Sequence, residues 1–171
     1  RFAAVQRHYT YALINRPVRP ALEAGRVGWY HRPLDADRMR AALEPVVGTH
    51  DFSAFRAAEC QARSPVKTLA RAAVRADADI LRFDFSADAF LHHMIRNLVG
   101  ALVVVGSGRE PATWIGELLA GRDRRRAALR NTTPARRYSR PTGEYDATVA
   151  RACDKRPERR AATADALAID P

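Results

Sequence analysis

The strongest constraint on this chain's fold is an apolar run over residues 90–105 that contains a single arginine. Asp88 precedes the run as a candidate helix N-cap, and Gly106 and Gly108 follow it as stop signals. The segment Ala101–Val105 is apolar on every side, which predicts a helix in the centre of the domain. Helical spacing predicts one core-facing stripe, made of Leu91, Met94, Ile95, Leu98 and Leu102.

The arginine is Arg96, and its charge can be buried only if it is paired. His92 precedes it by one helical turn, and His93 and Asn97 fall on the neighbouring strip. A polar strip centred on an arginine in an apolar helix predicts the wall of a functional site. The alternative is that the arginine extends to solvent and that both histidines are ordinary polar residues.

Length and charge set the class of the protein. A chain of 171 residues can form one domain with a sizeable core, with or without a tail. Its formal net charge of +10 comes almost wholly from arginine and favours a polyanionic partner, with nucleic acid first and an anionic membrane surface second. The run Ala101–Val105 is too short to span a bilayer, so we expect no membrane insertion. Cys60 and Cys153 form no disulfide framework or zinc site, so the default location is a reducing cytoplasm.

Periodicity and turn residues predict an α+β fold, with a mainly antiparallel sheet and helices packed on one face. Asp35 should cap the first helix, whose buried stripe would be Ala36, Met39, Leu43 and Val47. The expected elements are strands over 2–14 and 25–31, a helix to residue 47, a loop over 48–65, strands over 67–76 and 80–86, and helices over 88–105 and from 111.

The expected organisation has three parts. Residues 1–30 form a strand segment, residues 31–130 form the α+β domain, and residues 131–171 form a basic, poorly ordered tail. Arg1 has no methionine before it, and Phe2 enters a strand pattern at once, so we expect a fragment whose N-terminal part is missing.

Three chemical motifs are disfavoured by their spacing. His92 and His93 are adjacent, so their rings diverge on a helix and no metal site is expected. The segment Gly106–Gly108 follows a helix rather than a strand, which does not fit a phosphate-binding loop. Asp51 near His50 and Ser53 suggests a hydrolase, but nothing places a nucleophile beside a base.

Nucleic-acid binding has better support, because aromatic residues alternate with arginines at two places. Such aromatic rings can stack on unpaired bases while guanidinium groups contact phosphates. The alternative is that the aromatic residues belong to the core and the arginines form a solvated rim. The two groups are Arg1, Arg7, His8, Tyr9 and Tyr11, and then Phe52, Phe55, Arg56 and Arg63.

Three blocks of this sequence resemble the tRNA pseudouridine synthase A family, in the same order and spacing. The third block, Phe-Leu-His-His-Met-Ile-Arg-Asn-Leu-Val-Gly at 90–100, is the most specific. The other two blocks cover residues 1–11 and 48–65. The resemblance implies a cofactor-free isomerase that converts uridines of the tRNA anticodon stem-loop, at tRNA positions 38 to 40, into pseudouridine. It also implies a homodimer.

The resemblance assigns roles to individual residues. Tyr9 matches the tyrosine that stacks on the target base and takes part in removing the C5 proton. Arg96 matches the basic residue that pairs with the catalytic aspartate and keeps it ionised. Arg7, with His92 and His93, would line or support the same cleft, and Arg56 and Arg63 would hold the RNA backbone. These residues are the predicted catalytic and substrate-binding set.

Two departures from the family pattern stand out. The family's aspartate lies in a Gly-Arg-Thr-Asp segment that this chain does not contain, so we expect the chain alone to be inactive. Residues 131–171 also lack the family's closing Gly-Leu-aromatic-Leu strand and Tyr-Pro ending, as a changed reading frame would explain. The alternative function is a non-catalytic RNA-binding module that contacts tRNA.

Overall fold

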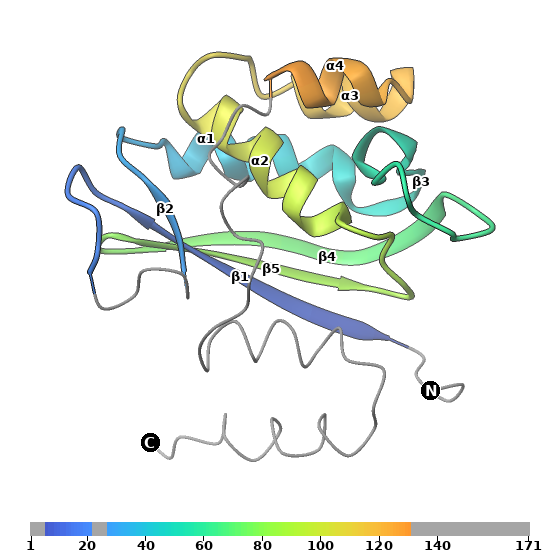
Figure 1. The fold of residues 1–171 in the computed structure, drawn as a ribbon, viewed down its shortest axis with the longest axis horizontal. Helices are drawn as coiled ribbons and strands as arrows, with labels where there is room; N and C mark the ends of the chain where they lie inside the picture. The colour runs from blue at the N-terminus through green and yellow to red at the C-terminus, as the bar shows by residue number, and fades with distance from the viewer. Residues whose placement is uncertain (1–5, 22–26, 131–171) are drawn as a thin grey trace.

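The computed structural model describes residues 6–21 and 27–130, which form one sheet covered on one face by helices (Figure 1). This arrangement confirms the expected α+β class. The strands are β1 Arg7–Asn15, β2 Gly28–Tyr30, β3 Gly48–Asp51, β4 Val66–Asp77 and β5 Ile80–Ala87. The helices are α1 Ala36–Leu43, α2 Met94–Gly106, α3 Trp114–Gly121 and α4 Arg124–Arg130, with 3₁₀ turns η1 Glu44–Val46 and η2 Ser53–Phe55.

The five strands lie in the order β2-β1-β5-β4-β3. Each pair is antiparallel except β1 with β2, which is parallel over three residues from Leu13↔Gly28. The strands expected over 67–76 and 80–86 are confirmed as β4 and β5, which form a hairpin with Asp77 opposite Ile80 and Ala78 in the left-handed region at φ 47°. β1 therefore lies inside the sheet, between β2 and β5.

The residues of β1 alternate between the two faces of the sheet, as expected of a strand. Tyr9, Tyr11 and Leu13 share the face under the helices, and Leu13 and Tyr11 belong to the core or pack against it. The expected start of this strand at Phe2 lies outside the described residues. The second strand is described only from Gly28, so its expected start at residue 25 also falls outside.

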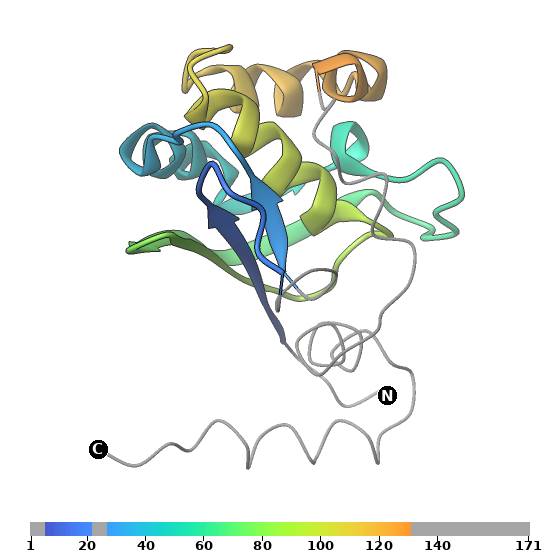
Figure 2. The same ribbon diagram turned by 60° about the vertical axis from the view of Figure 1, so that its left-hand side comes forward.

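α2 is the central helix, as its apolar sequence predicts. Figures 1 and 2 show it between the sheet and the layer formed by α3 and α4. Each residue from Ala101 to Val105 is buried, as are Met94, Leu98 and Leu102. Apolar side chains on every side of a helix require neighbours on every side, which this position provides.

The predicted start of α2 is wrong. Asp88 does not cap it, because its carboxylate accepts the backbone N–H groups of Thr68, at 3.1 Å, and of Ala89. The helix begins only at Met94, after His93 in the left-handed conformation at φ 59°. Binding Asp88 to the β4 backbone keeps the chain at the end of the sheet, so residues 90–93 form a non-helical link.

The first helix starts as predicted but ends early. The Asp35 carboxylate accepts the N–H groups of Asp37, at 2.9 Å, and Arg38, at 3.0 Å. Pro45 has no N–H to donate, and the chain tightens there into η1. As a result Val46 is fully buried and Val47 is 44% exposed, so the prediction that Val47 completes the buried stripe is wrong.

The segment expected to be a loop over 48–65 begins instead with strand β3. β3 pairs with β4 at the sheet edge, from Gly48↔Leu69 to Asp51↔Val66. Helix α3 buries Trp114 and the apolar residues that follow it, as expected, but begins at Trp114 rather than at Pro111. The short helix α4 was not predicted, although Asp123 caps it by accepting the N–H groups of Arg125 and Arg126. The tail predicted over 131–171 lies outside the described residues.

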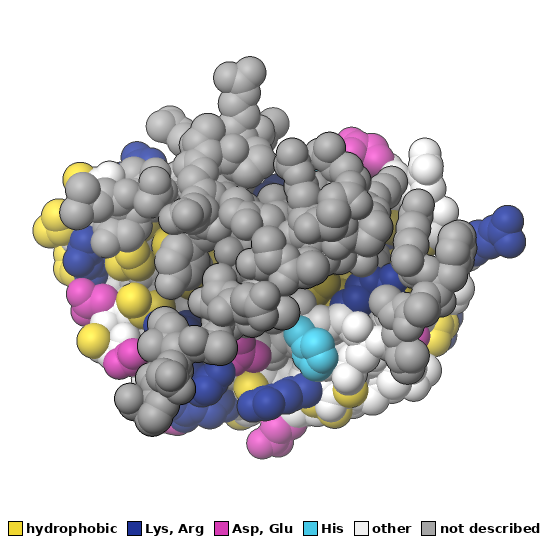
Figure 3. All heavy atoms as spheres, turned by 90° about the horizontal axis from the view of Figure 1, so that it is seen from below, with side chains coloured by type: hydrophobic (Ala, Val, Ile, Leu, Met, Phe, Trp, Pro, Cys, Tyr) yellow, Lys and Arg dark blue, Asp and Glu magenta, His cyan; other side chains and the backbone are white. Residues whose placement is uncertain are grey.

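The face of the sheet opposite the helices carries charged groups where Figure 3 shows it. On this face Asp84 of β5 accepts a hydrogen bond from the Thr10 hydroxyl at 2.7 Å and pairs with Arg75 at 2.6 Å. Burial acts to raise the pKa of Asp84, but these contacts and the charge of Arg71 outweigh it and lower the pKa. Among the described residues, no helix is long and apolar enough to cross a membrane.

Candidate active site

One end of the sheet brings the first and third sequence blocks together. Tyr9 of β1 lies on the helix-covered face, and its ring meets Phe90 edge to face, with centroids 4.6 Å apart and planes at 79°. Tyr9 is half-buried, so part of its ring is accessible. Phe90 belongs to the link that joins β5 to α2, and this contact therefore places Tyr9 beside the start of α2.

Arg7 ties the same two segments together. Its guanidinium donates to the backbone oxygen of Asp88 at 2.6 Å, across 81 positions of sequence. The side chain is half-buried, and this hydrogen bond fixes the beginning of β1 to the end of β5. Arg7 therefore supports the geometry of this end of the sheet, whether or not it also contacts a substrate.

The start of α2 presents two histidines and an arginine. The rings of His92 and His93 are stacked, with centroids 3.9 Å apart, and both residues are exposed. The expectation that the two rings diverge is therefore wrong, because both residues lie before the first residue of α2 and not on the helix. Although His93 is exposed, partial desolvation of its ring, together with the charges of His92 and Arg96, lowers its pKa, while Glu59 acts in the opposite direction. His93 therefore favours its neutral form.

Arg96 lies in the first turn of α2 and is exposed, so the expectation of a buried or half-buried arginine is wrong. Within residues 6–21 and 27–130, no salt bridge joins Arg96 to a carboxylate. The physical reason is the side of the helix on which it lies: Met94 and Leu98 on the same turns point into the core and are fully buried, and Arg96 points away from them. An exposed guanidinium at this point is accessible to an anionic group from outside the described part of the chain.

Three carboxylates of the described chain, Asp51, Asp84 and Asp88, have other partners. Asp51 accepts the N–H and hydroxyl of Ser53 and pairs with Arg122 at 3.4 Å, and the hydrogen bond from that hydroxyl is the main cause of its lowered pKa. Asp84 is bound on the opposite face of the sheet and Asp88 at its end. No cluster of three or more His, Cys, Asp or Glu side chains suited to a metal ion occurs among the described residues.

The segment over residues 52–62 departs most from its predicted role. Phe52 and Phe55 are fully buried in the core, so the prediction that they could stack on bases is wrong. The Arg56 guanidinium donates to the backbone oxygens of Cys60 and of Ala62, the latter at 3.1 Å. Arg63 directly follows this segment and is exposed.

Two contacts of this site were not predicted from the sequence. Phe90 contacts Tyr9, and its place in the most specific block was the only signal available. Asn97 donates from its side chain to the backbone oxygen of Phe55 at 2.9 Å, which joins α2 to η2. Only a three-dimensional structure shows this contact, because 42 positions separate the two residues.

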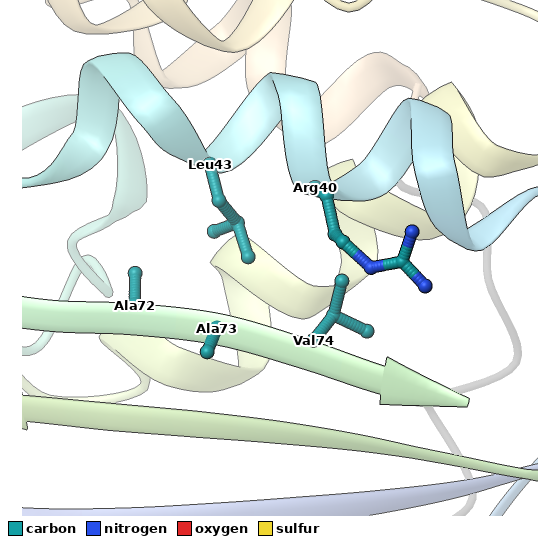
Figure 4. A pocket seen from close by; sticks show the side chains of 5 residues that line it. All are labelled: Arg40, Leu43, Ala72, Ala73 and Val74. Atoms are coloured by element: carbon teal, nitrogen blue, oxygen red, sulfur yellow. The ribbon is translucent and has the colours of Figure 1, made fainter. Parts of the chain in front are cut away.

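A shallow pocket elsewhere is unrelated to this site. It lies between α1 and β4 and is lined by Arg40, Leu43 and Ala72–Val74 (Figure 4). Its volume of about 190 Å³ is below the roughly 300 Å³ at which small-molecule sites begin. The ring pair and the arginine at the start of α2 therefore remain the better candidate.

Comparison with known proteins identifies the family to which this fold and this candidate site belong. Residues 42–149 match the tRNA pseudouridine synthase family, and the chain belongs to it. This match includes the link over 90–93 and the whole of α2, and it extends past residue 130.

Individual relatives are more specific. The chain is 62% identical over 128 residues to tRNA pseudouridine synthase A of Thiobacillus denitrificans, covering 75% of this chain and 49% of the relative. It is 61% identical over 129 residues to the protein of the same name from Aromatoleum aromaticum, with 75% and 49% covered. For Burkholderia thailandensis the identity is 59% over 128 residues, with 75% and 47% covered. The chain thus spans about half the length of these curated relatives.

Proposed function

We propose that this chain supplies one side of the active site of a tRNA pseudouridine synthase that acts on uridines of the anticodon stem-loop. The observation that carries the proposal is the placement of Tyr9, Phe90 and Arg96 at one end of the sheet, within the first and third sequence blocks that resemble the family. The net charge of +10 supports binding to a polyanion such as tRNA.

The reaction requires that the N1–C1′ bond of the uridine breaks, that the base turns, and that a C5–C1′ bond forms. The proton at C5 must then leave to a base. Tyr9 is proposed to stack on the extruded uracil and to accept that proton, directly or through water. Its half-buried ring, held by Phe90, offers both a stacking surface and a hydroxyl.

Arg96 is proposed to hold the catalytic aspartate in its ionised form. A guanidinium beside a carboxylate lowers the pKa of that carboxylate and orients it through paired hydrogen bonds. The exposure of Arg96 supports a partner that lies outside the described residues. In the family that partner belongs to a Gly-Arg-Thr-Asp segment. Stacked His92 and His93, with Arg7, would border the same cleft, and Arg63 would contact the RNA backbone.

The finer assignments belong to the same proposal. The family resemblance supports tRNA positions 38 to 40 as the modified sites, a homodimer as the assembly and the cytoplasm as the location. No cofactor is needed for the isomerisation, because no electrons are exchanged with another molecule. A non-catalytic RNA-binding module remains the second candidate, favoured by the absence of a described carboxylate paired with Arg96.

The proposal is tested by mapping pseudouridine in an unmodified tRNA transcript by carbodiimide modification and primer extension. One reaction contains this chain alone, and a second contains the chain extended at its N-terminus by the Gly-Arg-Thr-Asp half of a relative. We expect stops at positions 38 to 40 only in the second reaction. Stops elsewhere would reject the anticodon assignment, and tRNA binding without stops in either reaction would favour the non-catalytic module.

A further inference from the structure

A network of backbone hydrogen bonds connects residues 55–62 to the residues that precede Arg96. Ala57 donates its N–H to the oxygen of His92 at 3.1 Å, and His92 donates its own N–H to the Cys60 sulfur at 3.4 Å. Both backbone groups of His92 are therefore held by one short loop. Asn97 adds a third contact by donating to the oxygen of Phe55 at 2.9 Å.

Arg56 closes this loop on itself. Its terminal nitrogen donates to the oxygens of both Cys60 and Ala62, and Cys60 in turn donates its N–H to the oxygen of Ala57 at 3.2 Å. A planar guanidinium can bridge two carbonyl groups in a fixed geometry, which an ammonium on a flexible stem does not reproduce. The half-buried side chain is thus engaged within the protein.

The link that this loop holds is conformationally demanding. His93, directly after His92, has φ 59°, a region that costs a non-glycine residue roughly 1 kcal/mol or more unless its surroundings enforce it. The left-handed residue sets the direction in which α2 begins, and Arg96 follows in the first turn. Loss of the loop contacts would allow this residue to relax and the helix start to move.

We propose that Arg56 is a positioning residue, which fixes the loop over 56–62 and, through His92 and His93, sets the orientation of Arg96. This inference rests on the proposed function for the role of Arg96, but its structural part does not. It replaces the expectation from the sequence that Arg56 binds the RNA backbone. The pKa of the Cys60 thiol is consistent with this role of the loop. Burial acts to raise this pKa, but hydrogen bonds with Ala62, His92 and Arg56 outweigh burial and lower it.

The two roles predict different behaviour for Arg56→Lys. A phosphate contact needs the positive charge, so lysine would largely preserve it, whereas Arg56→Ala would weaken tRNA binding and reduce the salt dependence by about one counterion. A positioning role needs the two-carbonyl bridge, so lysine should fail nearly as badly as alanine. If Arg56 has the positioning role, Arg56→Lys should also leave the salt dependence of tRNA binding unchanged.

The test is amide hydrogen exchange on this chain, followed residue by residue at Ala57, His92 and Asn97 by NMR. We expect exchange at Ala57 and His92 to be about tenfold faster in both Arg56 variants, corresponding to about 1.4 kcal/mol of lost protection. Arg82→Lys, a change at an exposed arginine of β5, is the matched control and should leave these rates unchanged. Unchanged protection in Arg56→Lys would overturn the inference.

A second measurement uses the extended chain once it shows isomerase activity. Arg56→Lys should lower kcat about tenfold or more and leave KM for tRNA within about twofold, because Arg96 is displaced while RNA contacts remain. A raised KM with normal kcat would overturn the inference in favour of a direct RNA contact. If Arg56→Lys does not fold, Cys60→Ala removes the acceptor for the His92 N–H and should show the same pattern. If no active form exists, the proposed function fails, and hydrogen exchange still decides the positioning role.

Discussion

The ring of Tyr9 meets the ring of Phe90 edge to face, with centroids 4.6 Å apart and planes inclined at 79°. This contact joins Tyr9, the third residue of β1, to the link before α2, although 81 positions separate the two residues in the sequence. Edge-to-face pairs are favoured because the positive edge of one ring meets the negative face of the other. The contact thus fixes the plane in which Tyr9 could present its ring to a base.

Tyr9→Phe should impair chemistry more than binding. Phenylalanine keeps the ring and its contact with Phe90 but removes the hydroxyl, so tRNA affinity should change less than about twofold while the isomerisation rate falls about a hundredfold. Single-turnover kinetics and filter binding with the extended chain measure the two effects. A near-normal rate for Tyr9→Phe would remove the hydroxyl from the mechanism. Phe90→Ala, which leaves Tyr9 unsupported, should lower both affinity and rate.

Arg96→Ala in the extended chain should abolish turnover and largely spare tRNA affinity. Without the guanidinium, the catalytic carboxylate loses the charge that keeps it ionised and oriented, and about a hundredfold or more in rate should be lost. Arg96→Lys should recover part of the rate, because it restores charge but not the paired hydrogen bonds. Equal loss of rate and affinity in Arg96→Ala would show instead that this arginine binds RNA.

His93 should titrate below the ordinary histidine pKa of about 6.5. Burial and the charges of His92 and Arg96 lower its pKa in the folded state, so the folded chain binds this proton less readily than the unfolded chain. The stability associated with His93 is therefore present above pH 6.5 and is lost as the pH falls through its lower folded pKa. NMR titration of the ring should show opposite shifts in two variants: Glu59→Gln lowers the midpoint further, and Arg96→Ala raises it. Movement in the same direction in both would contradict this electrostatic account.

Asp84 should make the fold sensitive to acid. Its pKa is lowered in the folded state, since the hydrogen bonds from Thr10 and Arg75 outweigh burial, which acts to raise it. The stability it contributes is present above the unfolded value of about 3.9 and is lost as the pH falls through the lower folded pKa. Urea unfolding at pH 5 and pH 3 should show a smaller acid loss for Asp84→Asn than for the unchanged chain, with Thr10→Val between them. An identical loss in all three would exclude Asp84 as a source of acid sensitivity.

Local sequence patterns predict the fold where neighbours in the sequence determine it. The β4–β5 hairpin follows from alternation and a short turn, and the burial of α2 follows from an apolar run that admits no exposed side. The start of α2 could not be predicted in this way. It depends on two features that local patterns do not reveal. The Asp88 carboxylate binds the N–H of Thr68 in another strand, and His93 adopts the left-handed conformation, which is uncommon for residues other than glycine.

The candidate site was likewise predicted only where the sequence itself carries the signal. Sequence blocks identified Tyr9, His92 and Arg96, and the structure joins the segments that carry them through Phe90. The sequence did not reveal that Arg96 is exposed or that Phe52 and Phe55 fill the core. Nor did the sequence show that Arg56 binds carbonyl groups of its own loop. Aromatic residues and arginines in one loop fit two structures equally well: a buried aromatic core with solvated arginines around it, or an RNA-binding surface.

The most direct test of the central claim is tritium release from tRNA labelled at C5 of uridine. Release requires that the C5 proton leaves, which binding alone does not cause. We predict no release by this chain alone and release once the Gly-Arg-Thr-Asp half is joined to it, with the release lost again when Arg96 is replaced by alanine. Release by this chain alone would show that one of its own carboxylates performs the chemistry. No release from either form would contradict the assignment of this site to pseudouridine synthesis.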